Sequence, residues 1–420
     1  MASVRQLIER LIALRPERPL TLLAVCPNSS AVIEAGVLAA VRNRAPMLFA
    51  ATLNQVDLDG GYTGWTPEAF GAVLRRHAAL HHWEGPLIAC LDHGGPWLKD
   101  LHRAEGWSYE ATRDAVQASL RACLQAGYRL LHIDATIDLD PPAGSPVPVE
   151  RVAQRTVDLI QYAEAERERL GLLPVDYEVG TEEVHGGLVD EAAFDRFLVS
   201  LRHELEARRL LHAWPCFIVG KVGTDLHTTF FDPVTARRLY DRVAPLGSLI
   251  KGHYTDWVAN PEDYPAAGMG GANIGPELTT EEVRALGELE EMERTLRRSS
   301  DEQSHFGRRL QEAVLASGRW TKWLQPEERG LSFPDLAGER RSWLVETGAR
   351  YVWAQPSVQA ARRQLYENVR GVVPDPHRSV IERIVRAIER YIIAFHLRDS
   401  LSLFDQRSES VLGPEGSVAE

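Results

Sequence analysis

Short apolar segments alternate with longer helical patterns through about two thirds of this chain, and this alternation limits the folds available to it. The segments are apolar on both faces, which is typical of strands in a parallel sheet covered by helices on both sides. We predict strands at Leu20–Cys26, Pro46–Thr52, Pro86–Leu91, Arg129–Asp134, Val175–Thr181, Pro215–Gly220, Gly247–Gly252 and Gly270–Gly275.

The stretches between these strands have the length and apolar spacing of helices. They are Ser30–Arg44, Thr66–His82, Ser108–Ala126, Val149–Leu170, Glu191–Arg209 and Pro233–Ala244. Eight strand–helix units in roughly 275 residues fit a closed (β/α)8 barrel better than an open doubly wound sheet. No GxGxxG sequence follows the first strand, which counts against a dinucleotide-binding fold. We therefore predict an α/β fold, a (β/α)8 TIM barrel.

The pattern changes after Leu278, where helical spacing continues without strands. The predicted helices are Thr280–Arg298, Asp301–Ala316, Gln359–Val369 and His377–Leu397. Breaks that contain proline and glycine separate some of them and indicate loops. We predict a barrel over residues 1–278, a helical C-terminal subdomain packed on it over residues 279–405, and a flexible tail over residues 406–420.

Charge and cysteine content narrow the functional classes. The net charge of −12 disfavours nucleic acid as a partner. Four cysteines, Cys26, Cys90, Cys123 and Cys216, are far apart and form no CxxC pair, so neither a disulfide framework nor a zinc knuckle is expected. The N-terminal segment lacks the apolar core of a signal peptide, and no apolar stretch reaches the roughly 20 residues that span a bilayer. We expect a cytoplasmic protein with a small-molecule substrate and no membrane partner.

Polar side chains follow every predicted strand, at the barrel end where TIM-barrel active sites lie. We expect Asp92 and Glu182 to be catalytic, and His93, Glu182 and His253 to be metal ligands. The candidate substrate-binding residues are Asn28, Asn54, Gln55, Asp134, Lys221, Asp256 and Asn273.

The simplest chemical grouping within this set is His93, Glu182 and His253 around one divalent metal. Imidazole and carboxylate suit Zn²⁺, with Mn²⁺ or Ni²⁺ as alternatives, and three protein ligands leave a position open for substrate. Asp92 precedes one of these ligands and is the candidate general base. Each residue also has a simpler explanation, because single histidines are commonly structural. Asp134 could cap a helix, and Asn28 with Ser29 fits a helix N-cap.

At these motifs the chain resembles the Z-type subunit family of class II tagatose-bisphosphate aldolases, which includes ketohexose (tagatose/fructose) 4-epimerases. The resemblance covers most of the chain, the helical region included. It lies in these segments: Ala51-Thr-Leu-Asn-Gln-Val56, Gly60-Gly-Tyr-Thr-Gly-Trp-Thr-Pro67, Asp92-His-Gly-Gly-Pro96, His132-Ile-Asp-Ala135, Gly180-Thr-Glu182, Gly252-His-Tyr-Thr-Asp256, Ile274-Gly-Pro276 and Arg350-Tyr-Val-Trp353.

The resemblance implies a TIM barrel of the class II aldolase type, with Asp92 as base and His93, Glu182 and His253 as metal ligands. It also implies that Asn273 contacts substrate. The Z-type subunits were named as non-catalytic helpers of a separate aldolase subunit, whereas some relatives are implied to interconvert fructose and tagatose at C4. A homo-oligomer or an aldolase partner subunit is therefore an open alternative for assembly.

The chain departs from the family pattern after the predicted fifth to eighth strands. Aldolases acting on bisphosphates use loops rich in glycine and serine after the last two strands to bind phosphate. Here Tyr254-Thr-Asp-Trp257 and Gly275-Pro-Glu277 offer carboxylates, which repel a phosphate. This departure favours an unphosphorylated ketose, or a phosphate-binding charge placed elsewhere in the fold.

The chemistry of C4 epimerisation selects a mechanism. The C4 hydrogen of a 2-ketose is not adjacent to the carbonyl, whereas cleavage of C3–C4 gives a stabilised enediolate. A metal would act as Lewis acid for that charge, and Asp92 would remove the C4 hydroxyl proton. We therefore expect a metal-dependent epimerase (an isomerase) acting by retro-aldol cleavage and re-addition. The alternatives are a class II aldolase (a lyase) that releases the fragments and a non-catalytic stabilising subunit.

Overall fold

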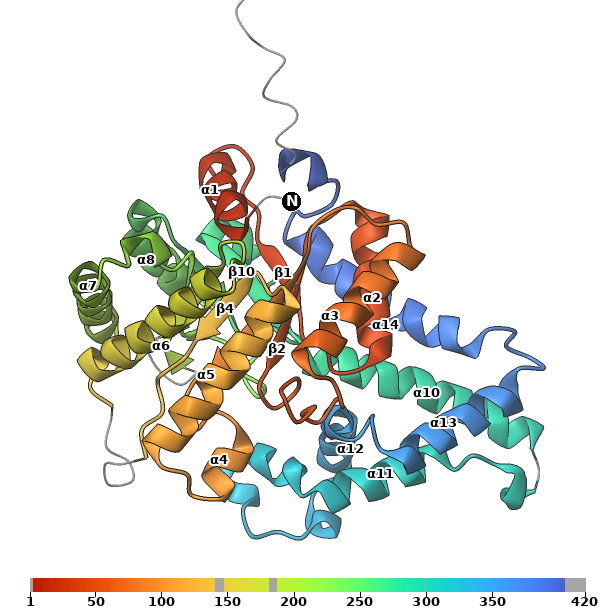
Figure 1. Cartoon of the computed structure of the whole chain (residues 1–420). Coiled ribbons are helices and arrows are strands. Elements are labelled where there is room, and N and C mark those ends of the chain that lie inside the picture. Colours follow the sequence, from red (N-terminus) through yellow and green to blue (C-terminus); the bar gives the residue numbers. More distant parts are fainter. Residues whose placement is uncertain (1–2, 140–146, 181–186, 298, 405–420) are drawn as a thin grey trace, which may run out of the picture.

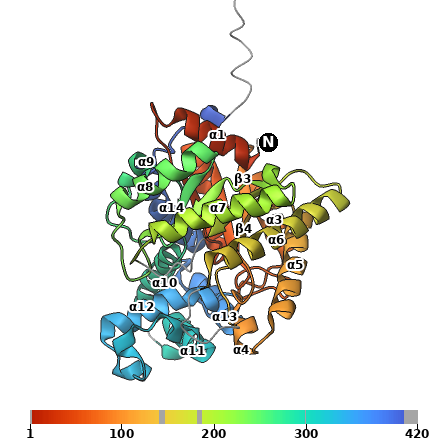
Figure 2. The same ribbon diagram turned by 90° about the vertical axis from the view of Figure 1, so that its left-hand side faces the viewer.

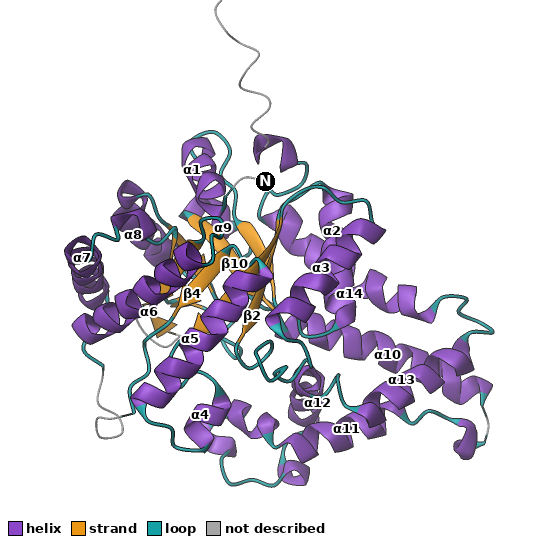
Figure 3. Cartoon of the chain, viewed as in Figure 1, coloured by secondary structure: helices purple, strands orange, loops and turns teal. Residues whose placement is uncertain are grey.

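A closed barrel of parallel strands forms the centre of the structure, a computed structural model that describes residues 3–139, 147–180, 187–297 and 299–404. The order around the barrel is β1-β10-β9-β7-β5-β4-β3-β2. The strands are β1 (Leu22–Val25), β2 (Met47–Thr52), β3 (Leu87–Gly94), β4 (Leu130–Ile133), β5 (Asp176–Gly180), β7 (Phe217–Val219), β9 (Leu249–Gly252) and β10 (Met269–Ile274). Helices enclose these strands (Figure 3). The predicted TIM barrel is confirmed.

The helices of the barrel layer are α1 (Val4–Leu14), α2 (Ser30–Asn43), α3 (Pro67–Leu80), α4 (Asp100–Ala104), α5 (Tyr109–Ala126), α6 (Val149–Arg169), α7 (Glu191–Ala207), α8 (Pro233–Val243) and α9 (Asp263–Ala267). Local sequence fixes where several of them begin. The side chains of Ser29, Thr66 and Ser108 each accept a hydrogen bond from an N–H group in the first turn of the helix that follows. This cap satisfies a donor that has no partner inside the helix.

Helix α1 lies at the end of the barrel where the strands begin. Arg5 on α1 bonds to Asp176 at the start of β5, and Arg15 donates to the carbonyls of Pro265 and Met269. Figures 1 and 2 show α1 at one end of the molecule and α4, α11 and α12 at the other. The second end is where the strands finish, and it carries the polar residues singled out above.

The C-terminal region is helical, as predicted. Its helices are α10 (Pro276–Leu296), α11 (Phe306–Ser317), α12 (Gly338–Gly348), α13 (Pro356–Val369) and α14 (Pro376–Ala394), with short 3-10 turns at Arg319–Trp323 and Ala349–Tyr351. Helix α14 packs against α2 and α10 (Figure 1). Backbone bonds join this end of the chain to the barrel, from Thr21 to Phe395 and from Asp399 to Asn43.

Some predicted boundaries differ from the structure. Helix α10 begins at Pro276, so the predicted boundary at residue 278 falls inside a helix, and the division into barrel and subdomain stays a prediction. Helix α12 was missed, because its sequence has little amphipathic spacing. An antiparallel pair, β6 (Gly187–Leu188) with β8 (Val222–Gly223), was also missed because each strand is two residues long. The predicted flexible tail lies outside the described residues.

None of the helices within the described ranges is long and apolar enough to cross a membrane.

Candidate active site

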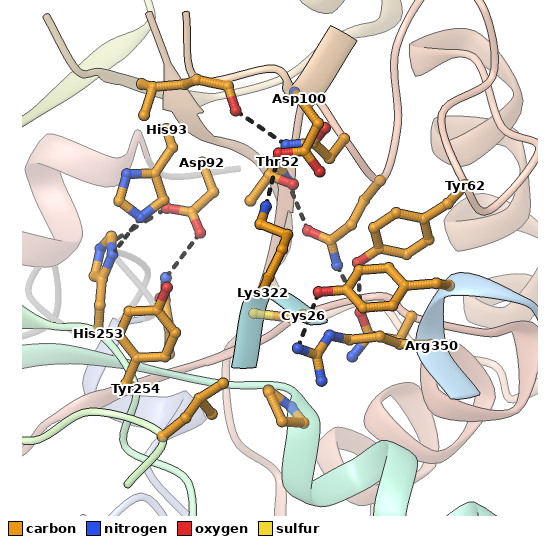
Figure 4. Close-up of a pocket in the computed structure, with 18 of the residues that line it drawn as sticks. Cys26, Thr52, Tyr62, Asp92, His93, Asp100, His253, Tyr254, Lys322 and Arg350 are labelled. Carbon is orange, nitrogen blue, oxygen red and sulfur yellow. Dashed lines mark hydrogen bonds and ion pairs between the residues drawn. The ribbon is translucent and has the colours of Figure 1, made fainter. Parts of the chain in front are cut away.

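One cavity of about 350 Å³ lies at the C-terminal ends of the strands. Most of the predicted site residues line it: Asn28, Asn54, Gln55, Asp92, His93, Asp134, His253, Asp256 and Asn273. Lys221 is not among the lining residues. It lies between β7 and β8, where its carbonyl accepts the Val189 N–H. Glu182 falls outside the described residues, so its predicted ligand role stays a prediction. Figure 4 shows the arrangement of this pocket.

Asp92 and His93 both reach the cavity, although adjacent residues on a regular strand point to opposite faces. The pairing of β3 with β4 shifts register between Leu91 and Gly94, which is a local bulge. His93 also has a φ of 49°, in a region that non-glycine residues rarely adopt. A bulge re-aims a side chain in this way, and strain of this kind concentrates at functional sites. The local distortion therefore places two neighbouring functional groups in one pocket.

The imidazoles of His93 and His253 face each other. His93 Nε2 lies 2.9 Å from His253 Nδ1. The far nitrogen of each ring bonds to a carboxylate: His93 Nδ1 lies 2.5 Å from Asp134, and His253 Nε2 lies 2.9 Å from Glu178. Because the pKa of His93 is raised to about 9, this ring is protonated on both nitrogens at neutral pH and its Nε2 donates to His253 Nδ1. A divalent metal that displaced this proton would meet a lone pair from each near nitrogen, since the carboxylates accept the N–H of each far nitrogen.

This convergence fits a divalent metal. Asp92, His93, His132 and His253 each offer a ligand atom, and these atoms all lie within 4.8 Å of one another. Nitrogens bound tetrahedrally to Zn²⁺ are roughly 3.3 Å apart, so the two histidines need to separate by only a few tenths of an ångström. A carboxylate behind each histidine is also the usual support of a metal ligand. The residues present therefore suit the metal that the sequence predicts.

Asp92 lies beside the paired histidines, with Oδ1 3.8 Å from His253 Nε2. Burial raises its pKa, but the positive potential of His93 and His253 and a hydrogen bond from His132 outweigh burial and lower the pKa well below the usual range. Burial likewise lowers the pKa of His93, yet Asp92 and Asp134 raise it to about 9. At neutral pH Asp92 is therefore an ionised group that can accept a proton.

His132 and Asn273 complete the surroundings of Asp92. His132 Nδ1 lies 3.2 Å from one oxygen of Asp92, and the Asn273 amide donates to the other at 3.3 Å. His132 Nε2 and Asn273 Oδ1 are buried and have no partner within the described part of the chain. A buried polar atom without a partner is costly, and a substrate hydroxyl could satisfy Asn273 Oδ1.

A buried ion pair, Lys251 with Glu178, holds His253 in position. Lys251 Nζ lies 2.5 Å from one oxygen of Glu178, whose other oxygen bonds to His253, and both side chains are at most 1% exposed. Burial raises the pKa of Glu178, but Lys251, His132 and His253 lower it to about 2. Sequence reasoning missed this pair, although opposite charges within two apolar strands are a usable signal.

The amides of the loop after β2 are engaged mainly in holding the wall of the cavity. Asn54 bonds to the Leu98 carbonyl and to the Asp100 N–H. Gln55 donates to Asn28 Oδ1, which also accepts a hydrogen bond from the Tyr62 hydroxyl. These bonds orient Asn28 and Tyr62 at the edge of the pocket, so the predicted substrate role of Asn54 and Gln55 stays a proposal.

Asp256 lines the cavity and also caps helix α10. Its Oδ1 accepts hydrogen bonds from the N–H groups of Gly275 and Glu277. Burial and the nearby Glu277 carboxylate raise its pKa to about 7. Asp134 resembles it in having a structural task, since its Oδ1 accepts from both the backbone and the hydroxyl of Thr136.

The C-terminal helical region also contributes to the cavity, which sequence reasoning did not anticipate. Lys322, Trp323, Arg350 and Tyr351 line it together with the barrel residues. They come from the two 3-10 turns on either side of α12. The Arg350-Tyr-Val-Trp353 segment had been noted as part of a resemblance, but nothing in its sequence indicates a contact with the barrel mouth. The active-site wall is thus shared between the barrel and the helices that follow it.

Comparison with solved structures supports the same fold. The chain is similar to a protein described as a probable tagatose 6 phosphate kinase from Sinorhizobium meliloti 1021, with 24% identity and a TM-score of 0.69 over 89% of this chain and 100% of that one. It is also similar to the fructose-bisphosphate aldolase of Campylobacter jejuni, with 11% identity and a TM-score of 0.57 over 95% of this chain and 96% of that one.

A family model matches residues 7–379, which include the barrel, its polar strand ends and most of the helical region. The described family is the D-tagatose-1,6-bisphosphate aldolase subunit GatZ/KbaZ-like family. The cavity with its paired histidines and the helical wall both fall within the matched residues. The chain belongs to the GatZ/KbaZ-like family.

Proposed function

We propose that this protein is a metal-dependent ketose 4-epimerase of the fructose/tagatose type that works by cleaving and re-forming the C3–C4 bond. The observation that carries the proposal is the placement of ionised, buried Asp92 beside the converging nitrogens of His93 and His253. A base next to a metal-capable pair is what retro-aldol chemistry requires. His93 and His253 would hold the metal, with Glu182 as the sequence-predicted third ligand.

The residues of this chain account for the proton transfers. Asp92 accepts the proton of the C4 hydroxyl, the C3–C4 bond breaks, and its electron pair passes toward the C2 carbonyl. The products are a C4 aldehyde and an enediolate over C2 and C3. After the aldehyde turns, C3 attacks its other face and Asp92 returns the proton to the C4 oxygen. A bound divalent metal supplies Lewis-acid stabilisation for the negative charge on the enediolate oxygens.

The wall of the cavity supports epimerisation over release of fragments. Trp323, Arg350 and Tyr351 add a wall from the helical region to the barrel mouth. Asp92 and His253 are each only 4% exposed. A wall over the barrel mouth would slow the escape of a cleaved aldehyde and so favour its re-addition. An aldolase would use the same residues but release the aldehyde, and a non-catalytic subunit would convert no sugar.

Product analysis tests the proposal. Purified protein is incubated with Zn²⁺, Mn²⁺, Ni²⁺ or a chelator and offered fructose, tagatose or their phosphates, with products followed by NMR. We expect metal-dependent conversion of one ketohexose into its C4 epimer without three-carbon products. Triose formation would establish an aldolase instead. Metal binding without conversion of any of these sugars would contradict the epimerase proposal and support a subunit role.

A further inference from the structure

Arg350 is a buried cationic residue that lines the cavity and forms no ion pair with a carboxylate of the described residues. It lies in the 3-10 turn Ala349–Tyr351, outside the barrel, and its side chain lines the cavity while the residue is only 5% exposed. No Asp or Glu oxygen in the described ranges lies within 4.0 Å of its guanidinium. Arg155 is buried to a similar degree, but it pairs with Asp138 at 3.1 Å. Arg350 therefore differs from Arg155 in having no ion pair within the described ranges. Arg15 has none either, but its guanidinium donates to three backbone carbonyls at the other end of the barrel, whereas Arg350 lines the cavity.

The protein holds this guanidinium in place with neutral groups. Its Nη1 donates to the Thr347 carbonyl at 2.6 Å, and its Nη2 donates to the Tyr351 hydroxyl at 3.1 Å. The guanidinium carbon lies 4.9 Å from the centre of the Trp323 ring and 4.7 Å from that of Tyr351. These contacts fix the orientation of the fork but do not neutralise its charge. A guanidinium stays protonated, and a buried charge without an ionic partner is unfavourable.

Further positive charge surrounds this side of the cavity. Asp100 is the carboxylate at this rim, and it is contacted by Lys322 at 2.7 Å, Arg319 at 3.4 Å and Arg103 at 3.8 Å. Three cations share one carboxylate, so the rim keeps an excess of positive charge even though the chain as a whole carries −12. Arg103 and Lys322 line the same cavity as Arg350. A local excess of this kind attracts anions.

The opposite side of the cavity carries the reacting groups. Figure 4 shows His93 and His253 together on one side of the pocket and Arg350 on the other. A ligand whose reacting carbons lie near Asp92 would thus extend its far end toward Arg350. A guanidinium fork matches the geometry of a phosphate or a carboxylate and binds it through two parallel hydrogen bonds.

We propose that Arg350 anchors an anionic terminal group of the ketose, a phosphate or a carboxylate on the carbon farthest from the C2 carbonyl. This inference rests on the proposed function for the identity of the sugar. It also accounts for the carboxylates after β9 and β10: the anion-binding charge comes from the helical region instead of from those loops. The substrate class is then an acidic ketose, and the helices after the barrel carry its recognition.

Equilibrium binding tests the anchor without requiring turnover. Isothermal titration of the metal-loaded protein compares fructose, fructose 6-phosphate and fructuronate, which carries a carboxylate at C6. We expect wild type to bind at least one of the two acidic ketoses about 10- to 100-fold more tightly than fructose. A charge-assisted bidentate hydrogen bond strengthens binding by about this factor. A preference for fructose 6-phosphate identifies phosphate as the group bound, and a preference for fructuronate identifies carboxylate.

Two variants separate the anchor from general effects on the pocket. R350Q should bring the affinities of acidic and neutral ketose to within about twofold, whereas R350K should keep part of the preference. R15Q is the matched control, because Arg15 is also buried and forms no ion pair within the described ranges, but it lies at the opposite end of the barrel, where it donates to the carbonyls of Leu20, Pro265 and Met269. It should retain the wild-type preference. The affinity ratio does not depend on the fraction of folded protein, which guards against a destabilised variant.

A further measurement on wild type needs no variant. Inorganic phosphate should weaken the binding of fructose 6-phosphate and leave the binding of fructose unchanged. The proposal is overturned if wild type binds neither acidic ketose more tightly than fructose, or if R350Q keeps the full preference. An Arg350-dependent preference without any sugar conversion would retain the anchor and reject the epimerase. Conversion of fructose with no preference for acidic sugars would support the epimerase and reject the anchor.

Discussion

His93 Nε2 and His253 Nδ1 point at each other across 2.9 Å, and a carboxylate binds the far nitrogen of each ring. On the His93 side, Asp134 uses one oxygen for the imidazole and the other for the Thr136 N–H. Both Asp134 oxygens therefore act as acceptors, one for the His93 Nδ1–H and one for the Thr136 N–H. Asp134 thus keeps a proton on His93 Nδ1, so that Nε2 is the nitrogen that would give up its proton to a metal.

Asp134→Asn should reduce the affinity for metal. The asparagine oxygen would remain on the Thr136 N–H, so its NH₂ group would face His93 Nδ1 and favour the tautomer with the proton on Nε2. We expect the affinity for Zn²⁺ to fall about 10- to 100-fold, the usual effect of losing such a support. Competition with a chromogenic chelator measures the change. Asp57→Asn is the control, because Asp57 is equally buried but pairs with Lys99.

Asp92→Asn should abolish most turnover while leaving metal bound. Loss of a positioned general base lowers kcat by about 10²- to 10⁴-fold. Metal content and conversion of the preferred ketose are measured on the same preparation. Normal turnover would exclude Asp92 as the base, and a loss of metal in parallel with activity would assign it to the ligand set instead.

Lys251→Met should destabilise the fold strongly. It would leave the Glu178 carboxylate buried with one oxygen unpaired, and breaking a buried ion pair in this way costs about 3–5 kcal/mol. Replacing both partners, with Lys251→Met and Glu178→Gln, should recover most of that loss because no unpaired charge remains. Urea unfolding of the wild type, the two single variants and the double variant gives the coupling directly. Additive effects would mean that the pair contributes little.

Asp256→Asn should become more stable relative to wild type as pH rises. The folded pKa of Asp256 is raised to about 7 from its usual 3.8, so between these values the native state binds a proton that the unfolded state has lost. The wild-type free energy of unfolding therefore falls across this window, by at most about 1.4 kcal/mol per pH unit from this group, and levels off above pH 7.

The asparagine variant lacks this loss, because its amide oxygen can still accept from Gly275 and Glu277. Melting temperatures of both proteins from pH 5 to 8 measure the gap. Asp190→Asn provides the comparison: Asp190 caps α7 through the same kind of bonds, but it is exposed. Its gap from wild type should stay constant with pH. A constant gap for Asp256→Asn would show that its carboxyl ionises normally.

Much of the barrel could be predicted because strands that are buried on both faces leave continuous apolar runs, which alternate in the sequence with helical spacing. The polar strand ends followed from the same frame, since the C-terminal ends of parallel strands meet on one side of a barrel. This frame correctly brought Asp92, His93, His253 and Asn273 into one cavity. It could not show that a bulge turns Asp92 and His93 to the same face, because that depends on the register between β3 and β4.

Other features of the site depend on tertiary contacts that leave little local pattern. Lys221 was expected in the site because it follows a strand, but its backbone pairs with Val189 beside the β6–β8 ribbon instead. Arg350 and Lys322 lie far along the chain from any strand, so strand position gives no hint of their approach to the barrel mouth. Glu178 and Lys251 were hidden within strands that pattern analysis treats as apolar.

The bonds that join Phe395 to Thr21 and Asp399 to Asn43 also constrain how the molecule assembles. Strand β1 and helix α2 are synthesised before the other strands of the barrel, yet α14, which packs on α2, is synthesised only after β10. Until α14 has been synthesised, the face of α2 that it covers has no partner there on the nascent chain. Docking of α14 onto α2 is therefore a late event with a high loop-closure entropy. We would expect nascent chains of this length to depend on protection from aggregation until residue 404 has emerged.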